Sequence, residues 1–399
     1  MRLAFVGTFV VAFCMAASAL TEGQAREHKP VFKGGKSSTG WIAFEFQDSK
    51  RIFIPVKING HDTKVLLATG LPTSNIDKAF AASIGLQPQQ NSNAAASGAG
   101  ASAGLIRGLQ IQIGNLTLED TSASPVNFAP LAEHIGHALP FLLGDDAFNH
   151  LVVDIDFARQ RIAFSDPGSE TRPDGAVEVP LLKVDDTPVI PVSIEGASPA
   201  QFELGLGNSG EMLVYQSYYE SHKLTAGRPV SKRLAAGTGG FVIETVATLK
   251  QAEFAGVRFE SMPAAFIPAS VAGTTSNVIA GDVGLPVLSR FRLIIDYSHG
   301  RLWAVPYPDA GRAAFAKDRL GLALNKKDTR FGVEFVAPDS PAEAAGFKTG
   351  DRITLIDGKP AQAWPETEFA NLRYEASGTI LTFTMEDGAA RRVKLVDYF

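Results

Sequence analysis

Acidic residues next to hydrophobic runs are the side chains of this sequence best suited to chemistry. Two carboxylates held close together share one proton, because both cannot ionise at short range, and such a pair can act as general acid and base. Glu203 precedes Gly205 by two residues, so on a strand both would lie on the same face. The other acids are expected in turns, at helix starts or at strand ends in structural roles: Asp62, Asp145, Asp146, Asp154, Asp156, Asp282 and Asp296.

Histidine, serine and phosphate-binding chemistry have weaker support. His134 and His137 would share one helix face, with Asp145 and His150 further along, but a histidine-rich surface loop is the simpler explanation of this spacing. The spacing G-x-S-x-G occurs only at Gly100 to Gly104, inside a run of small residues and not between a strand and a helix, and residues 98–104 lack the lysine and following helix of a phosphate-binding loop. The sequence therefore predicts no metal site and no cofactor.

The strands that must position the acidic residues occur twice along the chain. Val65 to Gly70 matches Phe202 to Gly207, and each segment follows a strand with alternating apolar residues. Further on, Leu142-Leu143-Gly144 is paired with Ile279-Ala280-Gly281. Matching features in the same order predict two homologous β-rich lobes, at residues 41–170 and 175–308.

The C-terminal part of the chain has a different pattern. Ser340 to Glu343 forms a capping box with proline at the first helical position, and Gly350 to Ile356 predicts a strand before an Asp-Gly turn. Pro365 to Tyr374 has the apolar spacing of a helix. Residues 316–399 are therefore expected to form a separate small domain.

The repeated features resemble those of pepsin-like and retropepsin-like aspartic proteases. In that family each lobe carries Asp-Thr/Ser-Gly on a loop, a hydrophobic-hydrophobic-Gly strand passes through the loop, and a Gly-rich hairpin covers the cleft. The resemblance implies a mainly β, bilobal fold, with Leu142-Leu143-Gly144 and Ile279-Ala280-Gly281 as the crossing strands. It also makes the small-residue loop at 91–104 a candidate flap.

The two positions that correspond to the catalytic aspartates of the family hold Ala68 and Gly205. Neither side chain can hold or move a proton, so the resemblance predicts a cleft without its dyad in a monomer or in a dimer of identical chains. Glu203 is the candidate substitute carboxylate, and the alternative is that it faces solvent on the alternating strand.

The remaining motif positions, which would line the cleft, differ between the lobes. Thr69 and Gly70 match the first motif, and the resemblance gives the Thr69 hydroxyl hydrogen bonds between the lobes. The second motif keeps Gly207 but has Leu206, which cannot form a side-chain hydrogen bond. The second loop is thus expected to have lost its acid and its polar bracing, and the first loop only its acid.

Residues 316–399 resemble a bacterial PDZ domain, a small α+β fold, through the segment from Asp339 to Gly358. The resemblance implies that backbone N–H groups of Arg319-Leu320-Gly321-Leu322 hold the C-terminus of a peptide or protein, which adds a strand to the sheet. Phe369 or Leu372 would line the other wall of that groove. The alternative is that Leu320 and Leu322 are strand residues of the core.

The N-terminus has the pattern of a secretory signal peptide at residues 1–19, with a basic start, an apolar run and Ala17-Ser18-Ala19 as the cleavage site. Residues 20–40 are polar and are expected to be a flexible tail. The single cysteine, Cys14, lies in the apolar run, so the mature chain would have no disulfide or thiol. These features predict a bacterial periplasmic or secreted protein without membrane insertion after cleavage.

The sequence predicts an exported homologue of aspartic proteases that is catalytically inactive and binds a peptide or protein. The alternative is an active aspartic endopeptidase that uses a non-standard carboxylate. A formal net charge of −5 gives no reason to expect a nucleic-acid partner.

Overall fold

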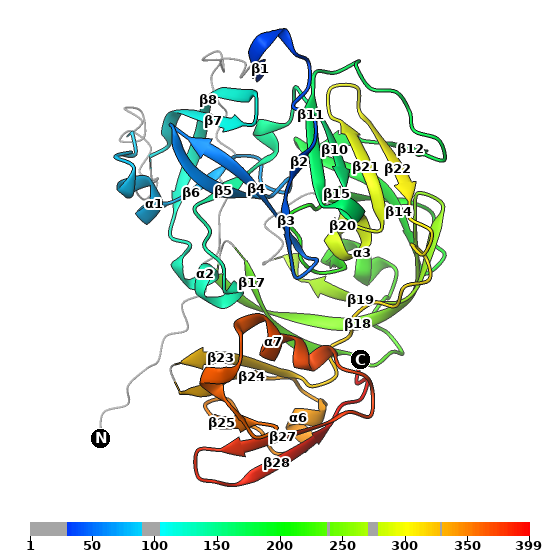
Figure 1. Cartoon of the computed structure of the whole chain (residues 1–399). Helices are drawn as coiled ribbons and strands as arrows, with labels where there is room; N and C mark the ends of the chain where they lie inside the picture. Colours follow the sequence, from blue (N-terminus) through cyan, green and yellow to red (C-terminus); the bar gives the residue numbers. More distant parts are fainter. Residues whose placement is uncertain (1–29, 90–103, 238–239, 270–277, 328) are drawn as a thin grey trace, which may run out of the picture.

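The computed structural model describes residues 30–89, 104–237, 240–269, 278–327 and 329–399. The predicted signal peptide, residues 20–29 of the tail and residues 91–103 of the candidate flap lie outside this part of the chain. The described residues form mainly β-strands, arranged in two lobe sheets, a sheet between the lobes and a C-terminal sheet (Figure 1). None of the helices in the described ranges has the length and apolarity needed to span a bilayer.

The first lobe is an eight-stranded sheet whose strands alternate buried and outward-facing residues. In β4 (Arg51–Ile58), Ile52, Ile54, Val56 and Ile58 are buried in the main core. The other strands of this sheet are β1 (Pro30–Phe32), β3 (Glu45–Gln47), β5 (His61–Leu67), β6 (Asn75–Asp77), β7 (Ile106–Ile113), β8 (Leu116–Val126) and β9 (Phe141–Leu143). Its helices are α1 (Lys78–Ser83) and α2 (Ala129–Ile135), with short 3₁₀ turns η1 (Lys33–Gly35) and η3 (Asp145–Ala147).

The second lobe repeats this plan with another eight-stranded sheet. Its β17–β18 hairpin extends from the sheet as a long ribbon. The strands are β13 (Leu182–Val184), β14 (Thr187–Ile194), β15 (Ala200–Leu204), β16 (Met212–Tyr215), β17 (Ser231–Gly237), β18 (Gly240–Phe254), β19 (Val257–Ile267) and β20 (Ile279–Val283). Its helices are α3 (Gln216–Ser221) and α5 (Leu285–Leu288).

A six-stranded sheet joins the two lobes, because β10 of the first lobe pairs with β21 of the second. Asp154 on β10 forms an ion pair of 2.7 Å with Arg292 on β21 across this junction. The strands are β2 (Ile42–Ala43), β10 (Val152–Asp156), β11 (Arg161–Ser165), β12 (Val177–Pro180), β21 (Phe291–Asp296) and β22 (Arg301–Pro306), with η4 (Phe157–Arg159) after β10.

The C-terminal sheet has its own apolar core and lies beside the β17–β18 hairpin (Figure 1). Ser340 caps α6 (Pro341–Ala344) by accepting from the Glu343 N–H, and the Glu343 carboxylate accepts in return from the N–H of Asp339, the residue before the N-cap. The elements are β23 (Leu322–Lys327), β24 (Arg330–Val336), β25 (Arg352–Ile356), β26 (Lys359–Pro360), η5 (Ala361–Ala363), α7 (Glu366–Asn371), η6 (Leu372–Tyr374), β27 (Ile380–Met385) and β28 (Ala390–Lys394).

The expectation of a flexible tail is wrong for residues 30–40. Residues 30–32 form β1, which pairs with β8, and Phe32 packs against the main core. Ser38 bridges to Ser165, and the Thr39 N–H donates to the Phe164 carbonyl at 2.9 Å. These backbone hydrogen bonds fix the segment against the first lobe, although its polar composition did not predict a strand.

Candidate functional site

The first motif loop, at the end of β5, has apolar surroundings where the family has a carboxylate. Ala68 is 5 % exposed and belongs to a cluster with Leu66 and Leu142. A Cβ added at Gly207 of the second loop would lie 3.0 Å from the Ala68 Cα. Because the two loops approach this closely, only very small residues fit where they meet.

The second motif loop, after β15, is filled by an acid from the neighbouring strand. A Cβ added at Gly205 would lie 2.6 Å from the Cγ of Asp282 on β20. The Asp282 carboxylate therefore occupies the space that a side chain at position 205 would need. The expectation that Asp282 is a loop or helix-start residue is wrong, because it lies within β20.

Backbone hydrogen bonds show how the crossing strand of the second lobe is placed. The Gly205 N–H donates to the Val283 carbonyl at 3.0 Å, as the Ala68 N–H donates to the Leu143 carbonyl at 2.9 Å. Val283 therefore corresponds to Leu143 of the first lobe. The crossing segment is Asp282-Val283-Gly284, and the assignment to Ile279-Ala280-Gly281 is wrong.

Glycine packing gives the same register. A Cβ at Gly144 would lie 2.7 Å from the Leu71 carbonyl, and a Cβ at Gly284 would lie 2.8 Å from the Asn208 carbonyl. Sequence comparison missed this register because an acid, Asp282, stands where the first lobe has the apolar Leu142.

Glu203 and Asp282 form an acid pair on the second lobe. They are register partners on the parallel strands β15 and β20, so their side chains share one face of the sheet. The Tyr215 hydroxyl donates to Glu203 Oε1 at 2.8 Å, and Asn208 Nδ2 donates to Asp282 Oδ1 at 2.9 Å. Glu203 also reaches the first loop, because its Oε2 lies 4.0 Å from a Cβ added at Gly70.

The protonation of this acid pair follows from its burial. Removal from water raises the pKa of Asp282 to about 8, with a further contribution from the nearby Glu203 charge. Burial also raises the pKa of Glu203, and the Tyr215 hydrogen bond opposes that rise. The pair can therefore hold a proton near neutral pH, although both acids come from one lobe.

Thr69 joins the two loops through its hydroxyl. The side chain is buried, and its Oγ1 donates to the Leu204 carbonyl at 2.7 Å and accepts from the Leu206 N–H at 3.1 Å. Leu206 is itself buried in the main core. One polar side chain thus braces both loops.

The other acids found in the sequence lie outside this meeting point of the loops. Asp145 is buried, and burial raises its pKa to about 6 although Lys183 lies 3.8 Å away. Asp146 accepts from the N–H and hydroxyl of Ser74. The remaining acids form ion pairs: Asp62 with Lys57, Asp154 with Arg292, Asp156 with Arg159 and Arg161, and Asp296 with His299 and Arg301.

The histidines are occupied by aromatic and ionic contacts. His137 stacks on Phe53 with a centroid distance of 3.9 Å and lies 3.3 Å from Glu45. His134 meets Phe241 of β18 edge-on at 5.1 Å. The described part of the chain contains no group of three or more His, Cys, Asp or Glu residues able to hold a metal ion.

The residues expected to form the PDZ groove are largely core residues. Leu320 and Leu322 are buried in the core of the C-terminal sheet. Phe369 packs against Phe331, and the centroids of the two rings lie 4.8 Å apart. Leu372 packs against this core from its edge. Arg319 is paired with Asp397 at 2.6 Å.

The backbone N–H groups of the loop before β23 already have an acceptor within the chain. The N–H groups of Leu320 and Gly321 donate to Asp318 Oδ1 at 2.9 and 2.8 Å. Gly321 has a positive φ of 78°, and an added Cβ there would meet the Ser340 side chain, so only glycine fits this loop. Sequence reasoning passed over Asp318, although an Asp two and three residues before backbone donors is typical of an Asx turn.

A cavity of about 260 Å³ lies where both lobes and the C-terminal domain meet. Residues of β23 and α7, of β17 in the β17–β18 hairpin and of the loop after the second motif line this cavity. Its lining includes Lys50, His134, Glu211, Arg233, Asp318 and Phe369.

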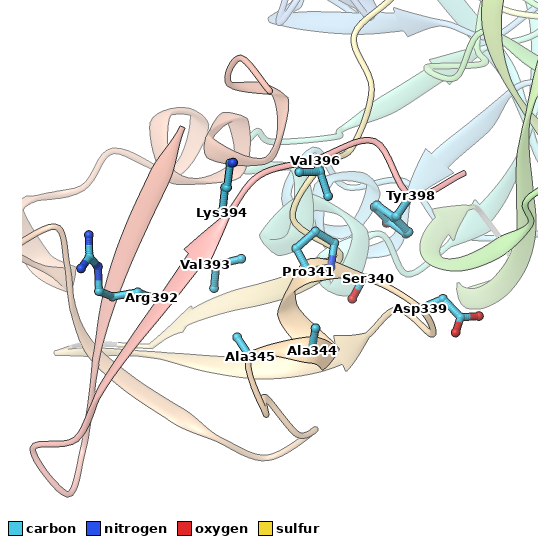
Figure 2. Close-up of a pocket in the computed structure, with 10 residues that line it drawn as sticks. All are labelled: Asp339, Ser340, Pro341, Ala344, Ala345, Arg392, Val393, Lys394, Val396 and Tyr398. Atoms are coloured by element: carbon cyan, nitrogen blue, oxygen red, sulfur yellow. The ribbon is translucent and has the colours of Figure 1, made fainter. Parts of the chain in front are cut away.

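A second cavity, of about 400 Å³, lies on the C-terminal domain between α6, β28 and the segment after β28 (Figure 2). Tyr398 lines both cavities, so the segment that carries it lies between them. The second cavity lies apart from the groove predicted from sequence, which is bordered by β23 and α7.

Comparisons with known proteins support both parts of this architecture. Residues 54–150 match the family described as "gag-polyprotein putative aspartyl protease", and residues 314–386 match the PDZ domain family. The chain thus carries an aspartic-protease-like domain and a C-terminal PDZ domain. An aspartic proteinase from Irpex lacteus is 12 % identical, with a TM-score of 0.38, over 69 % of this chain and 99 % of that one.

A curated relative shares a shorter segment. "Putative zinc metalloprotease NMA0084" from Neisseria meningitidis serogroup A / serotype 4A is 43 % identical over 79 residues. The match covers 20 % of this chain and 17 % of the length of that protein.

Proposed function

We propose that this protein binds a peptide or protein and does not hydrolyse peptides by the two-aspartate mechanism. One observation carries the proposal: Ala68 and Gly205 stand at the dyad positions, Gly207 packs against Ala68, and Asp282 fills the space beside Gly205. A water molecule activated between two aspartates needs one carboxylate from each lobe. On the first lobe, Ala68 lies in an apolar cluster that includes Leu66 and Leu142.

The binding role is supported by the PDZ domain. PDZ domains take an extended peptide beside an exposed strand, with main-chain hydrogen bonds for affinity. Here the groove of the domain opens into the cavity shared with both lobes. We therefore place the ligand between α7, β23 and the β17–β18 hairpin.

Export to a bacterial periplasm or to the cell exterior is part of the proposal. It is supported by the basic start, apolar run and Ala17-Ser18-Ala19 site of the first residues. The test is the N-terminal residue of the protein recovered from periplasm or medium, which we expect to be Leu20. Recovery of the chain from cytoplasm with Met1 retained would contradict export.

The decisive experiment for the absence of catalysis is a peptidase assay on residues 20–399. We would incubate the protein with a diverse peptide mixture between about pH 3 and pH 8 and detect new termini by mass spectrometry. We expect no cleavage above a buffer control at any pH. Cleavage by the wild type that disappears in Glu203→Gln would overturn this part of the proposal.

The acid pair favours one second candidate, an endopeptidase that uses Glu203 and Asp282. Its support is that the two carboxylates are register partners and that burial keeps a proton on the pair near neutral pH. In that case Glu203→Gln and Asp282→Asn would each abolish cleavage, whereas Glu220→Gln, an exposed acid on α3, would not. Equal cleavage by all three variants would point to a contaminating protease and exclude this candidate.

A further inference from the structure

The loop that would receive a ligand's C-terminal carboxylate already holds a carboxylate of the chain itself. Asp318 Oδ1 accepts from the N–H groups of Leu320 and Gly321 at 2.9 and 2.8 Å. The other oxygen of Asp318, Oδ2, lies 3.5 Å from Nη1 of Arg373 in η6, the turn that follows α7. The carboxylate thus has two backbone donors and one guanidinium, which are the partners that a bound peptide C-terminus would require.

Contacts on both sides of the loop hold this closed arrangement. The Arg319 N–H donates to the Arg373 carbonyl at 2.8 Å, so the loop is fastened to the turn that follows α7. Arg319 Nε also pairs with Asp397 at 2.6 Å. Displacing Asp318 would therefore cost two hydrogen bonds and leave a guanidinium without its carboxylate.

The surroundings of the loop favour a ligand that continues past it. The cavity at this end of the groove is lined by Asp318 and Arg373 of the PDZ domain, by Arg51 of the first lobe and by Glu211 and Arg233 of the second. A chain lying between β23 and α7 would run on past the loop into the space between the lobes and the β17–β18 hairpin. A chain that ended at the loop would compete with Asp318 for the same two N–H groups.

We propose that Asp318 closes the carboxylate-binding loop and that the groove selects an extended internal segment of a polypeptide over a free C-terminus. This proposal rests on the peptide-binding function proposed above and specifies its ligand class. The main chain of the ligand would pair with β23, and no terminal carboxylate would be recognised.

The test compares two phage libraries on the immobilised chain, residues 20–399. One library displays random heptapeptides with a free C-terminus, and the other displays the same heptapeptides joined through a fixed Gly-Ser tail to the N-terminus of the coat protein, so that they carry no free C-terminus. We expect the wild type to enrich sequences from the tailed library only. Asp318→Ala should free the two N–H groups and raise enrichment from the free-terminus library by about tenfold or more.

Controls separate the possible outcomes. Asp397→Ala removes the acid on the other side of Arg319 without touching the loop N–H groups, and it should behave as the wild type. Enrichment of free C-termini by the wild type would overturn the role of Asp318 and leave the binding function intact. Enrichment from neither library would overturn both proposals.

A second measurement needs no variant, so it decides even if Asp318→Ala fails to fold. Amide NMR of the wild type would follow Leu320 and Gly321 during titration with a selected peptide whose C-terminus is amidated and with the same peptide ending in a free carboxylate. We expect both peptides to change these two amide signals equally, because neither displaces Asp318. A shift that occurs only with the free carboxylate would contradict closure of the loop.

Discussion

Asp282 is the residue whose environment most alters its chemistry. Its carboxylate lies beside Gly205 in the position of a missing side chain, faces Glu203 on β15 and accepts from Asn208. Burial raises its pKa from 3.8 to about 8, so the folded chain keeps a proton that the unfolded chain loses above about pH 4. This residue therefore stabilises the fold fully at low pH and progressively less as the pH rises toward 8.

This pH dependence predicts how Asp282→Asn behaves. The amide is uncharged at every pH, so the free energy of unfolding of the wild type should fall relative to this variant between about pH 4 and pH 8. The slope should be at most about 1.4 kcal/mol per pH unit, the value for one proton. Urea unfolding at several pH values measures it, with Asp62→Asn as an exposed-acid control. Parallel curves for wild type and Asp282→Asn would contradict the protonated carboxyl.

At the scale of elements, the loops after β5 and β15 are held together chiefly through Thr69. Its hydroxyl donates to the Leu204 carbonyl and accepts from the Leu206 N–H of the opposite lobe. The Thr69 side chain is buried from solvent. The second loop has leucine at the equivalent position, 206, and therefore no hydroxyl that could form the same hydrogen bonds to the first loop. The side-chain hydrogen bonds at this junction of the lobes thus come from the first loop.

Thr69→Val keeps the shape of this side chain but removes its hydroxyl. We expect it to lower the free energy of unfolding by about 2 to 4 kcal/mol, because a buried donor and a buried acceptor lose their partner. Thr69→Ser retains the hydroxyl and should cost about 1 kcal/mol for the lost methyl group. Denaturant unfolding of both variants distinguishes these outcomes, and equal losses would show that the hydrogen bonds contribute little.

For the whole molecule, the important arrangement is the docking of the PDZ domain against both lobes. Lys50 of the first lobe donates to the Tyr374 hydroxyl at 3.3 Å and lies 4.5 Å from its ring centre. Ser231 of the hairpin donates to the Pro338 carbonyl at 2.6 Å. These contacts hold the PDZ domain beside the cavity that residues of both lobes also line.

Lys50→Ala should loosen this docking without disturbing the lobe sheets. We expect faster hydrogen–deuterium exchange in residues 366–374 and 231–237, and unchanged exchange in β10 and β21. Lys57→Ala is the matched control, because Lys57 pairs with Asp62 on an exposed hairpin of the same lobe. Unchanged exchange at α7 in Lys50→Ala would show that this contact does not hold the domain in place.

Local sequence patterns are enough to predict the mainly β fold, the repeat and the PDZ domain. Period-two strands such as β4, the helix cap at Ser340 and the motif loops at residues 68–70 and 205–207 are local patterns, so neighbouring residues alone specify them. The substitution of both dyad positions, by Ala68 and Gly205, can also be read directly from the chain.

The side chains that lie at the dyad positions and in the carboxylate-binding loop of the PDZ domain could be identified only from the folded chain. Asp282 reaches Gly205 because β20 lies parallel to β15 in a register that sequence matching displaced by three residues. Asp318 meets Arg373 because the loop before β23 and the turn after α7, distant in sequence, come together. Both results depend on distances between segments far apart in the chain, and such distances are set by packing of the whole fold rather than by local pattern.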